Sequence, residues 1–394
     1  MTTGLSKLRV LNDRAALSHI LRAGEVSRSE LEELTGLSKP ATAELLNRLE
    51  SAGLVHKLGM RSGGPGPKAQ LWGVRPEVGF AAGVNVTPGS IQVTITDLSG
   101  TVVASCERAE DPSASAAVRE ALRTACELAA ISADQILHAV IGLPGALDPR
   151  SGLLRFAPHM PAWSGYDLLA ALETELGLPA TVENDVNLMA LAELDGGLAA
   201  EVENFALIWI DAGLGAAIVL RRELFRGLTG GAGEIDYLPV PDRAVAETGG
   251  DRRGEKFGNL LSPAAISALS QAYGLPPLEP SALVAQACRE EDHPAFAGFL
   301  DDLAVRIATG LAAIVTVLDP ELLLLGGSIG VAGGQRLADL VRSKFGEVTS
   351  SPPDSIARVS ALSDSAGDVL AGATSLALKR AREKAFETGS ILTS

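Results

Sequence analysis

The 394-residue chain has few cysteines and no long apolar run. Its cysteines, Cys106, Cys126 and Cys288, lie far apart, which excludes both a disulfide framework and a CxxC-type metal box. No apolar stretch approaches the roughly 20 residues that cross a bilayer, and the first residues lack the apolar core of a signal peptide. We therefore expect a cytoplasmic protein that has no membrane partner.

Positive charge is scarce overall but concentrated at the start of the chain. The formal net charge is −15, yet residues 1–76 hold 11 Lys and Arg against 7 Asp and Glu, a balance of +4. The rest of the chain therefore carries −19. A basic head on an acidic body is typical of a DNA-binding module joined to a second domain, although chance clustering of surface charge would give the same count.

The first 51 residues predict three short helices. Apolar residues at helical spacing indicate a helix over 6–23, and a capping box formed by Ser27 and Glu30 opens the next, which ends at Gly36. Ser38 is suited to cap the third. The side chains expected to face inward are Leu8, Leu11, Ala15, Ile20, Leu21, Leu31, Leu34, Ala41, Leu45, Leu46 and Leu49.

The second and third helices are typical of a helix-turn-helix, whose last helix enters the major groove of DNA. Small side chains on the outer face would let the backbone approach the base edges. The residues that we expect to contact DNA from this helix are Ser38, Lys39, Thr42, Ala43, Asn47 and Arg48. A three-helix protein-interaction domain would contain the same helices.

Two strand-like runs follow, over 53–58 and 69–74. The segment that joins them is rich in Gly and Pro, carries Arg61 and Lys68, and cannot pack in a core. This arrangement is typical of a β-wing whose cationic tip lies along phosphates or in a minor groove. We predict a winged helix-turn-helix over residues 1–76.

From residue 79 onward the pattern alternates between strands and helices. Hairpin-like runs begin two successive α/β blocks, one at 80–103 and the other at 205–220. Further strands are expected over 139–143, 180–183 and 322–325, and helices over 113–131, 163–176, 186–194, 262–273, 281–289, 302–318 and 366–386. The pattern predicts a duplicated, two-lobed α/β fold with lobes at 77–198 and 199–394, a last helix packed on the first lobe, and a ligand between the lobes.

Motifs in this body resemble the ROK family of repressors and sugar kinases, which has an actin/hexokinase-like fold. The similar segments are 141–149, 156–163, 182–187, 225–235 and 325–329, in the order that the family has. The head is similar to that of family repressors for xylose or N-acetylglucosamine. The resemblance implies a bacterial transcriptional repressor that binds a double-stranded DNA operator as a homodimer or homotetramer and senses a sugar or sugar derivative.

The resemblance also implies a sugar site in the cleft. Asp185 matches the family's catalytic aspartate, Asn184 would bond sugar hydroxyls, and Glu234 matches a sugar-contacting glutamate. The residues expected to bind the ligand are Gly145, His159, Asn184, Asp185, Glu234 and Tyr237. Asn184 and Asp185 are equally suited to capping the helix that follows them. Trp163 and Tyr237 would either stack on the ligand or belong to the core.

The phosphate-binding half departs from the family pattern. Asn85 replaces an aspartate that helps to hold the metal–nucleotide complex, and Pro88 lacks the backbone N–H that a phosphate would use. In the second glycine turn, Asp211 would face a polyphosphate with a negative charge, which costs several kcal/mol at ~4 Å. We expect neither ATP binding nor enzymatic activity.

The family's structural zinc site is missing as well. Tyr237 takes the position of a zinc-binding histidine, and residues 248–261 contain no cysteine. Tyrosine cannot replace imidazole at tetrahedral zinc, so we expect no metal. Two alternatives stay open: a regulator whose body is only an oligomerisation scaffold, and an active sugar kinase that carries a DNA-binding head.

Overall fold

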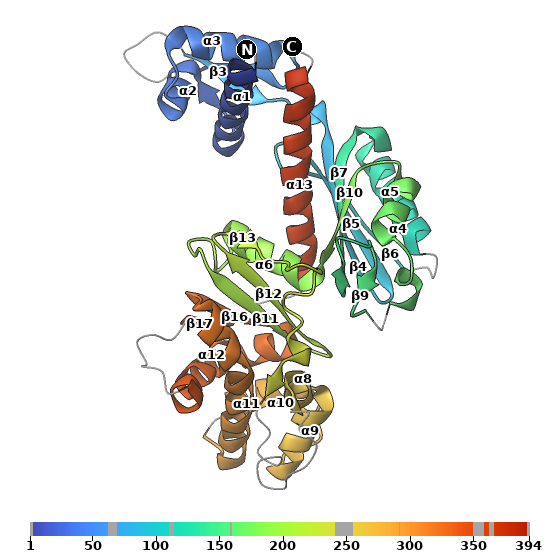
Figure 1. The fold of residues 1–394 in the computed structure, drawn as a ribbon, viewed down its shortest axis with the longest axis vertical. Helices are drawn as coiled ribbons and strands as arrows, with labels where there is room; N and C mark the ends of the chain where they lie inside the picture. The colour runs from blue at the N-terminus through green and yellow to red at the C-terminus, as the bar shows by residue number, and fades with distance from the viewer. Residues whose placement is uncertain are drawn as a thin grey trace.

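The computed structural model describes residues 3–61, 69–109, 114–157, 160–240, 255–290, 292–349, 358–361 and 366–391 (Figure 1). Along the chain it forms a head, a first lobe and a second lobe, and the long helix α13 (Ala366–Ile391) returns along the first lobe to the head. The predicted winged helix-turn-helix followed by a two-lobed α/β body is confirmed. In the described ranges, every helix is too short or too polar to span a bilayer.

The head consists of three helices and a small antiparallel sheet with the order β1-β3-β2 in its described part. Its elements are α1 (Thr3–Ala23), β1 (Val26–Ser27), α2 (Arg28–Thr35), α3 (Lys39–Ser51), β2 (Val55–Arg61) and β3 (Ala69–Val74). The capping box is confirmed, because the Ser27 N–H donates to the Glu30 carboxylate at 2.7 Å and the Glu30 N–H donates to Ser27 Oγ at 3.3 Å. α2 ends at Gly36, whose φ of 68° favours glycine.

The inward faces of the head differ from the prediction in part. Leu8, Leu11 and Leu34 are exposed, with 58%, 60% and 49% of their surface accessible, because α1 packs inward through other residues further along the helix. In α3 the inward position is Thr42, not Ala41. The Thr42 hydroxyl donates to the Ser38 carbonyl at 3.2 Å, and this bond offsets the cost of burying a polar group.

Each lobe contains a sheet of the same design. The first has the order β10-β7-β4-β5-β6 and the second has the order β17-β16-β11-β12-β13. In both, an antiparallel pair begins the lobe and parallel strands follow on the other side of its first strand. The strands are β4 (Phe80–Thr87), β5 (Ser90–Asp97), β6 (Val102–Ala109), β7 (Ile136–Leu143), β10 (Ala180–Asn184), β11 (Phe205–Ile210), β12 (Leu214–Leu220), β13 (Glu223–Leu224), β16 (Leu322–Gly326) and β17 (Arg358–Ala361). The predicted duplication is therefore present in the sheet topology.

Short strand pairs and helices complete the lobes. The pairs are β8 (Ala146–Leu147) with β9 (Leu154–Arg155), and β14 (Pro239–Val240) with β15 (Glu255–Lys256). The α-helices are α4 (Ala114–Ala129), α5 (Leu168–Leu176), α6 (Asp185–Gly196), α8 (Phe257–Leu261), α9 (Pro263–Ala272), α10 (Pro280–Arg289), α11 (Pro294–Leu318) and α12 (Gly327–Thr349). The sequence analysis missed α12 and β17. It also began α5 too early, because Asp167 caps that helix with its carboxylate on the Ala170 N–H.

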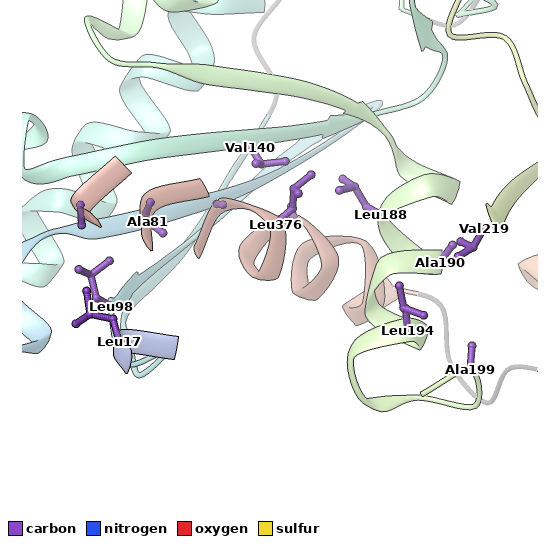
Figure 2. Close-up of a cluster of buried hydrophobic side chains, with 14 of the residues drawn as sticks. Leu17, Ala81, Leu98, Val140, Leu188, Ala190, Leu194, Ala199, Val219 and Leu376 are labelled. Carbon is purple, nitrogen blue, oxygen red and sulfur yellow. The ribbon is translucent and has the colours of Figure 1, made fainter. Parts of the chain in front are cut away.

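One hydrophobic cluster connects all three parts of the molecule, and Figure 2 shows some of its members. Leu17 of α1 belongs to it, as do Leu376 of α13, Leu188 of α6 and Val219 of the second sheet. α13 packs against β4, β7 and α6 and also contacts α1. This helix is therefore the common support of the head, the first lobe and the start of the second.

The packing of α13 against α6 and against β4 depends on two close approaches. A Cβ at Gly372 would lie 1.9 Å from the Leu188 carbonyl oxygen of α6, and a Cβ at Gly83 of β4 would lie 2.3 Å from Thr374 Oγ1 of α13. A backbone oxygen cannot rotate away as a side chain can. Position 372 therefore accepts only glycine at the present helix separation.

We expect Gly372→Ala to destabilise the protein by about 2 kcal/mol, because α13 must move away from α6. Gly346→Ala in α12 is the matched control, since a Cβ there meets nothing within 4 Å. It should be neutral or stabilising by up to about 1 kcal/mol. Urea unfolding of both variants measures the difference, and equal midpoints would contradict the packing described here.

Candidate functional site

The outer face of α3 is the candidate DNA-reading surface. Ser38, Lys39 and Asn47 are exposed and Ala43 is half-buried, so four of the predicted residues lie on or beside this face. Positions 39, 43 and 47 are four residues apart and therefore share one side of the helix. In Figure 1, α3 lies at the end of the molecule farthest from the second lobe.

The predicted outward placement is wrong for Thr42 and Arg48. Thr42 is fully buried in the core of the head. Arg48 Nη2 donates to Asp13 Oδ1 at 2.7 Å, and only 23% of the Arg48 side chain is accessible. Arg48 therefore joins α3 to α1 inside the head, and its charge is already neutralised by Asp13.

At the wing, Arg61 is exposed at the end of β2 but forms ion pairs with Glu30 at 2.6 Å and Glu25 at 3.2 Å. These pairs hold the wing against the start of α2. Lys68 lies outside the described residues. Glu44, which was not among the predicted DNA contacts, is also exposed, between Ala43 and Asn47.

A cavity of about 540 Å³ lies between the two lobes. It brings together five of the six predicted ligand residues, namely Gly145, Asn184, Asp185, Glu234 and Tyr237. The sixth, His159, lies outside the described residues. The cavity is also lined by Phe156, Trp209, Asp211 and Asp236, which the sequence analysis did not assign to the ligand.

Asn184 and Asp185 stand where β10 passes into α6. Asn184 caps the helix, because its Oδ1 accepts from the Asn187 N–H at 3.1 Å, and its Nδ2 donates across to the Gly145 carbonyl at 3.1 Å. Asp185 Oδ1 accepts from the Val186 N–H at 2.8 Å. Burial raises the pKa of Asp185 above its usual value. Helix capping and a position on the cavity wall thus coexist in these residues.

Glu234 is a second carboxylate in the cavity whose pKa is raised. Burial raises its pKa to about 7, and the nearby charges of Asp185 and Asp236 add to the rise. Its side chain makes no hydrogen bond or ion pair with another side chain in the described part of the protein. Near neutral pH this group changes its protonation state and is available to a ligand.

Aromatic rings form a further part of the cavity wall. The rings of Phe156 and Tyr237 have their centroids 5.6 Å apart at an interplanar angle of 54°, and Lys256 Nζ lies 4.5 Å from the Tyr237 centroid. Tyr237 is 51% exposed and so is free to contact a ligand. Trp163 is fully buried in the first lobe, and its core interpretation is the correct one.

An ion pair joins the two lobes at Glu183, the residue before Asn184. Arg226 of the second lobe donates to Glu183 Oε2 of β10 through Nε at 2.7 Å and Nη2 at 2.6 Å. Glu183 Oε1 accepts from Asn187 Nδ2 at 2.8 Å. Glu183 is buried whereas 44% of the Arg226 side chain is accessible, so this charge-assisted contact joins the two lobes with one partner in water. Neither Glu183 nor Arg226 was singled out from the sequence.

Asn85 and Asp211, which depart from the family's phosphate-binding pattern, both form hydrogen bonds within the protein. Asn85 is buried and its Nδ2 donates to Gln92 Oε1 at 3.2 Å. The Asp211 carboxylate accepts from the Ala212 N–H at 2.7 Å and from the Ser328 N–H, at the start of α12, at 3.1 Å. A carboxylate thus lies against a helix N-terminus, a position that would otherwise attract an external anion.

The expectation that zinc is absent concerns the residues near Tyr237. The described cysteines lie elsewhere, with Cys106 and Cys126 in the first lobe and Cys288 on α10. Across the described ranges, no group of three or more His, Cys, Asp or Glu is arranged to hold a metal ion. Residues 241–254 lie outside these ranges, and the sequence expectation for that segment rests on its lack of cysteine.

Comparison with known proteins gives relatives of two kinds. The chain is 24% identical over 237 residues to the xylose repressor of Bacillus subtilis, covering 59% of this chain and 61% of the repressor. It is 29% identical over 189 residues to the beta-glucoside kinase of Klebsiella pneumoniae, covering 48% of this chain and 63% of the kinase. The chain thus spans about three fifths of the length of each of these relatives.

The fold has a full-length counterpart among solved structures. A ROK family transcriptional regulator, described as a homologue of the Escherichia coli MLC protein, superposes with a TM-score of 0.74 at 18% identity, covering 98% of this chain and 99% of that one. Residues 11–59 match the MarR family, and residues 81–380 match the ROK family. The match to the ROK family covers about three quarters of the chain. The chain therefore belongs to the ROK family.

Proposed function

We propose that this protein is a DNA-binding transcriptional regulator, a repressor, whose interlobe cleft senses a sugar or sugar derivative. The observation that carries the proposal is the continuous core that joins a winged helix-turn-helix to a two-lobed body through α13. Relatives that are named repressors support it. The protein acts in the cytoplasm, where its operator is.

The DNA-reading residues in this proposal are Ser38, Lys39, Ala43 and Asn47 on α3, with Arg61 and Lys68 at the wing. Lys39 and the wing would contact phosphates, whereas Ala43 and Asn47 would face base edges. Helix-turn-helix proteins read two half-sites about one helical turn apart. We therefore propose a homodimer or homotetramer on a double-stranded operator.

The sensing step would take place in the cleft. A ligand held by Asn184, Asp185 and Glu234 touches residues of both lobes and so favours one lobe arrangement over another. A tenfold preference for one arrangement corresponds to about 1.4 kcal/mol. Asp185 begins α6, and α6 packs on α13, which leads to the head. This route connects the ligand to the DNA-reading surface through packed elements.

We further propose that kinase activity is lost. The Asn85 amide stands where a kinase needs a carboxylate, and the Asp211 carboxylate occupies backbone donors at the start of α12. A kinase relative and the presence of Asp185 favour the alternative of an active sugar kinase. The remaining alternative is a regulator whose body acts only as an oligomerisation scaffold. Absence of binding of every sugar tested would favour this alternative.

Replacing Lys39 by alanine should weaken operator binding and lower the slope of log affinity against log salt by about 0.9, since one phosphate contact is lost. Electrophoretic retardation at several salt concentrations measures this slope. Arg119→Ala, which removes an exposed cation from α4 in the first lobe, is the matched control and should leave the slope unchanged. An unaltered slope in Lys39→Ala would refute the placement of α3 on DNA.

Arg48→Ala separates a structural effect from a DNA contact. It leaves Asp13 without its partner inside the head, and we expect it to lower stability by about 1–2 kcal/mol. Lys39→Ala should leave the thermal midpoint of the head within experimental error, because Lys39 is exposed. If Arg48→Ala is as stable as the wild type but fails to bind DNA, Arg48 contacts DNA and the structural interpretation is wrong.

Kinase activity is tested with a coupled assay for ADP release over a panel of hexoses. We expect no turnover above background, and the same background for wild-type protein and Asp185→Asn. The variant keeps the side-chain shape and the helix start, so it should fold normally. Turnover in the wild type that disappears in Asp185→Asn would establish the protein as a kinase.

A further inference from the structure

Most cations of the helix-turn-helix and of the wing strand β2 are already paired within the head. Each Lys and Arg of α2, α3 and β2 other than Lys39 has a carboxylate partner in the described structure. The pairs are Arg28 with Glu32, Arg48 with Asp13, Lys57 with Glu50, and Arg61 with both Glu25 and Glu30. Affinity for the DNA backbone comes from cations that neutralise phosphates. A paired cation contributes to this affinity only after its carboxylate is released.

Arg61, at the end of β2, is held by two carboxylates at once. Its Nη1 lies 2.6 Å from Glu30 Oε1, and its Nη2 lies 3.2 Å from Glu25 Oε1. Between 44% and 47% of each of the three side chains is accessible, so the group lies on the surface of the head. Because one guanidinium faces two carboxylates, the group carries net negative charge. A phosphate that approaches Arg61 is therefore repelled until a carboxylate leaves.

The fold of the head brings these three side chains together. Glu25 precedes β1 and Glu30 follows it, whereas Arg61 ends β2 on the other side of the central strand β3. β2 contains a bulge just before Gly59, whose φ is 140°, and Gln70 Nε2 donates to the Gly59 carbonyl at 2.7 Å. A bulge bends its strand and changes the direction of the side chains beyond it. The contact of Arg61 thus reaches from one edge strand of the sheet to the segment around the other.

The two carboxylates differ in how firmly they are held. Glu30 Oε2 accepts from the Ser27 N–H at 2.7 Å, as part of the capping box of α2. Ser27, together with Arg61, lowers the pKa of Glu30 below its usual value, so Glu30 is ionised near neutral pH. Within the described part of the chain, Glu25 has no partner besides Arg61. Exposed ion pairs are weak, so Glu25 is the carboxylate that a phosphate would displace first.

We propose that Glu25 and Glu30 are internal substitutes for DNA phosphates and hold the wing in an autoinhibited position. The inference rests on the proposed DNA-binding function and describes its regulation. Arg61 joins the DNA backbone only when a phosphate replaces Glu25. This exchange disfavours DNA that the head holds through phosphates alone. On an operator, contacts of α3 to base edges offset the loss of the ion pair, so the exchange raises selectivity.

The test is fluorescence anisotropy of the full chain with a fluorescein-labelled duplex of random sequence, which reports phosphate contacts without an operator. Glu25→Gln should tighten binding about fivefold, since it removes one exposed ion pair that competes with phosphate. It should also steepen the slope of log affinity against log salt by about 0.9, because Arg61 gains a phosphate contact.

Glu33→Gln is the matched control. Glu33 is exposed on α2, and no described residue pairs with it, so the variant removes the same charge without touching Arg61. It should change the affinity by less than about twofold, since salt screens a charge that faces no phosphate. Glu30→Gln is a second probe, because glutamine also completes a capping box. It should tighten binding as well, and its thermal midpoint shows that the head stays folded.

A double-mutant cycle separates release of Arg61 from a general change in charge. In an Arg61→Gln background, Glu25→Gln should no longer alter the affinity or the salt slope, because the cation that it would release is missing. A gain from Glu25→Gln that Arg61→Gln abolishes supports the inference.

The other outcomes contradict it. Unchanged or weaker binding by Glu25→Gln, or a gain that persists in the Arg61→Gln background or appears equally in Glu33→Gln, overturns autoinhibition at the wing. DNA binding by the wild-type protein then stands. Absence of binding by the wild type and by every variant overturns the inference and the proposed DNA-binding function together.

Discussion

The rest of the structure depends on the packing of α13. This helix closes the chain, yet its apolar residues lie against α1 of the head, the central strands of the first sheet and α6. Arg382 strengthens the contact with hydrogen bonds to the carbonyls of Leu98 and Ser99, at 3.0 and 3.2 Å. Without α13, an apolar face of the first sheet and the inner face of the head would meet water.

The same packing connects the cleft, through α6, to α13, which contacts the head. Asp185 is both a wall of the cavity and the first residue of α6, and α6 meets α13 where Gly372 allows the helices to touch backbone to backbone. Tightly packed interiors do not deform continuously, so a shift of α6 requires a response from α13. The site and the DNA-reading surface are thus linked by elements in direct contact.

The cleft itself has a distinctive charge pattern for a family that includes sugar kinases. Phosphoryl transfer needs cations and free N–H donors around the transferred group. Here the described lining residues include four carboxylates and no Lys, Arg or His, and Asp211 occupies the donor at Ser328. The guanidinium of Arg226 is not among the described lining residues, because it pairs with Glu183 and so joins the two lobes. In the function proposed here, the cleft binds a polar small molecule and its phosphate chemistry is lost.

The sequence by itself determined the features that depend on neighbours within a few residues. The capping box at Ser27 and the glycine end of α2 are local, because their hydrogen bonds join residues three or four apart. The family motifs likewise led to Gly145, Asn184, Asp185, Glu234 and Tyr237, which the fold brings together in one cavity.

Only the tertiary structure decided which faces are buried and which charges are paired. The register of α3 buries Thr42, Asp13 neutralises Arg48 from 35 residues away, and Leu8 and Leu11 stay exposed. Helical periodicity tolerates a shift of one position, and partners distant in the chain leave no mark on the spacing. Ion pairing and burial are properties of surfaces that meet only after folding, so these assignments required the structure.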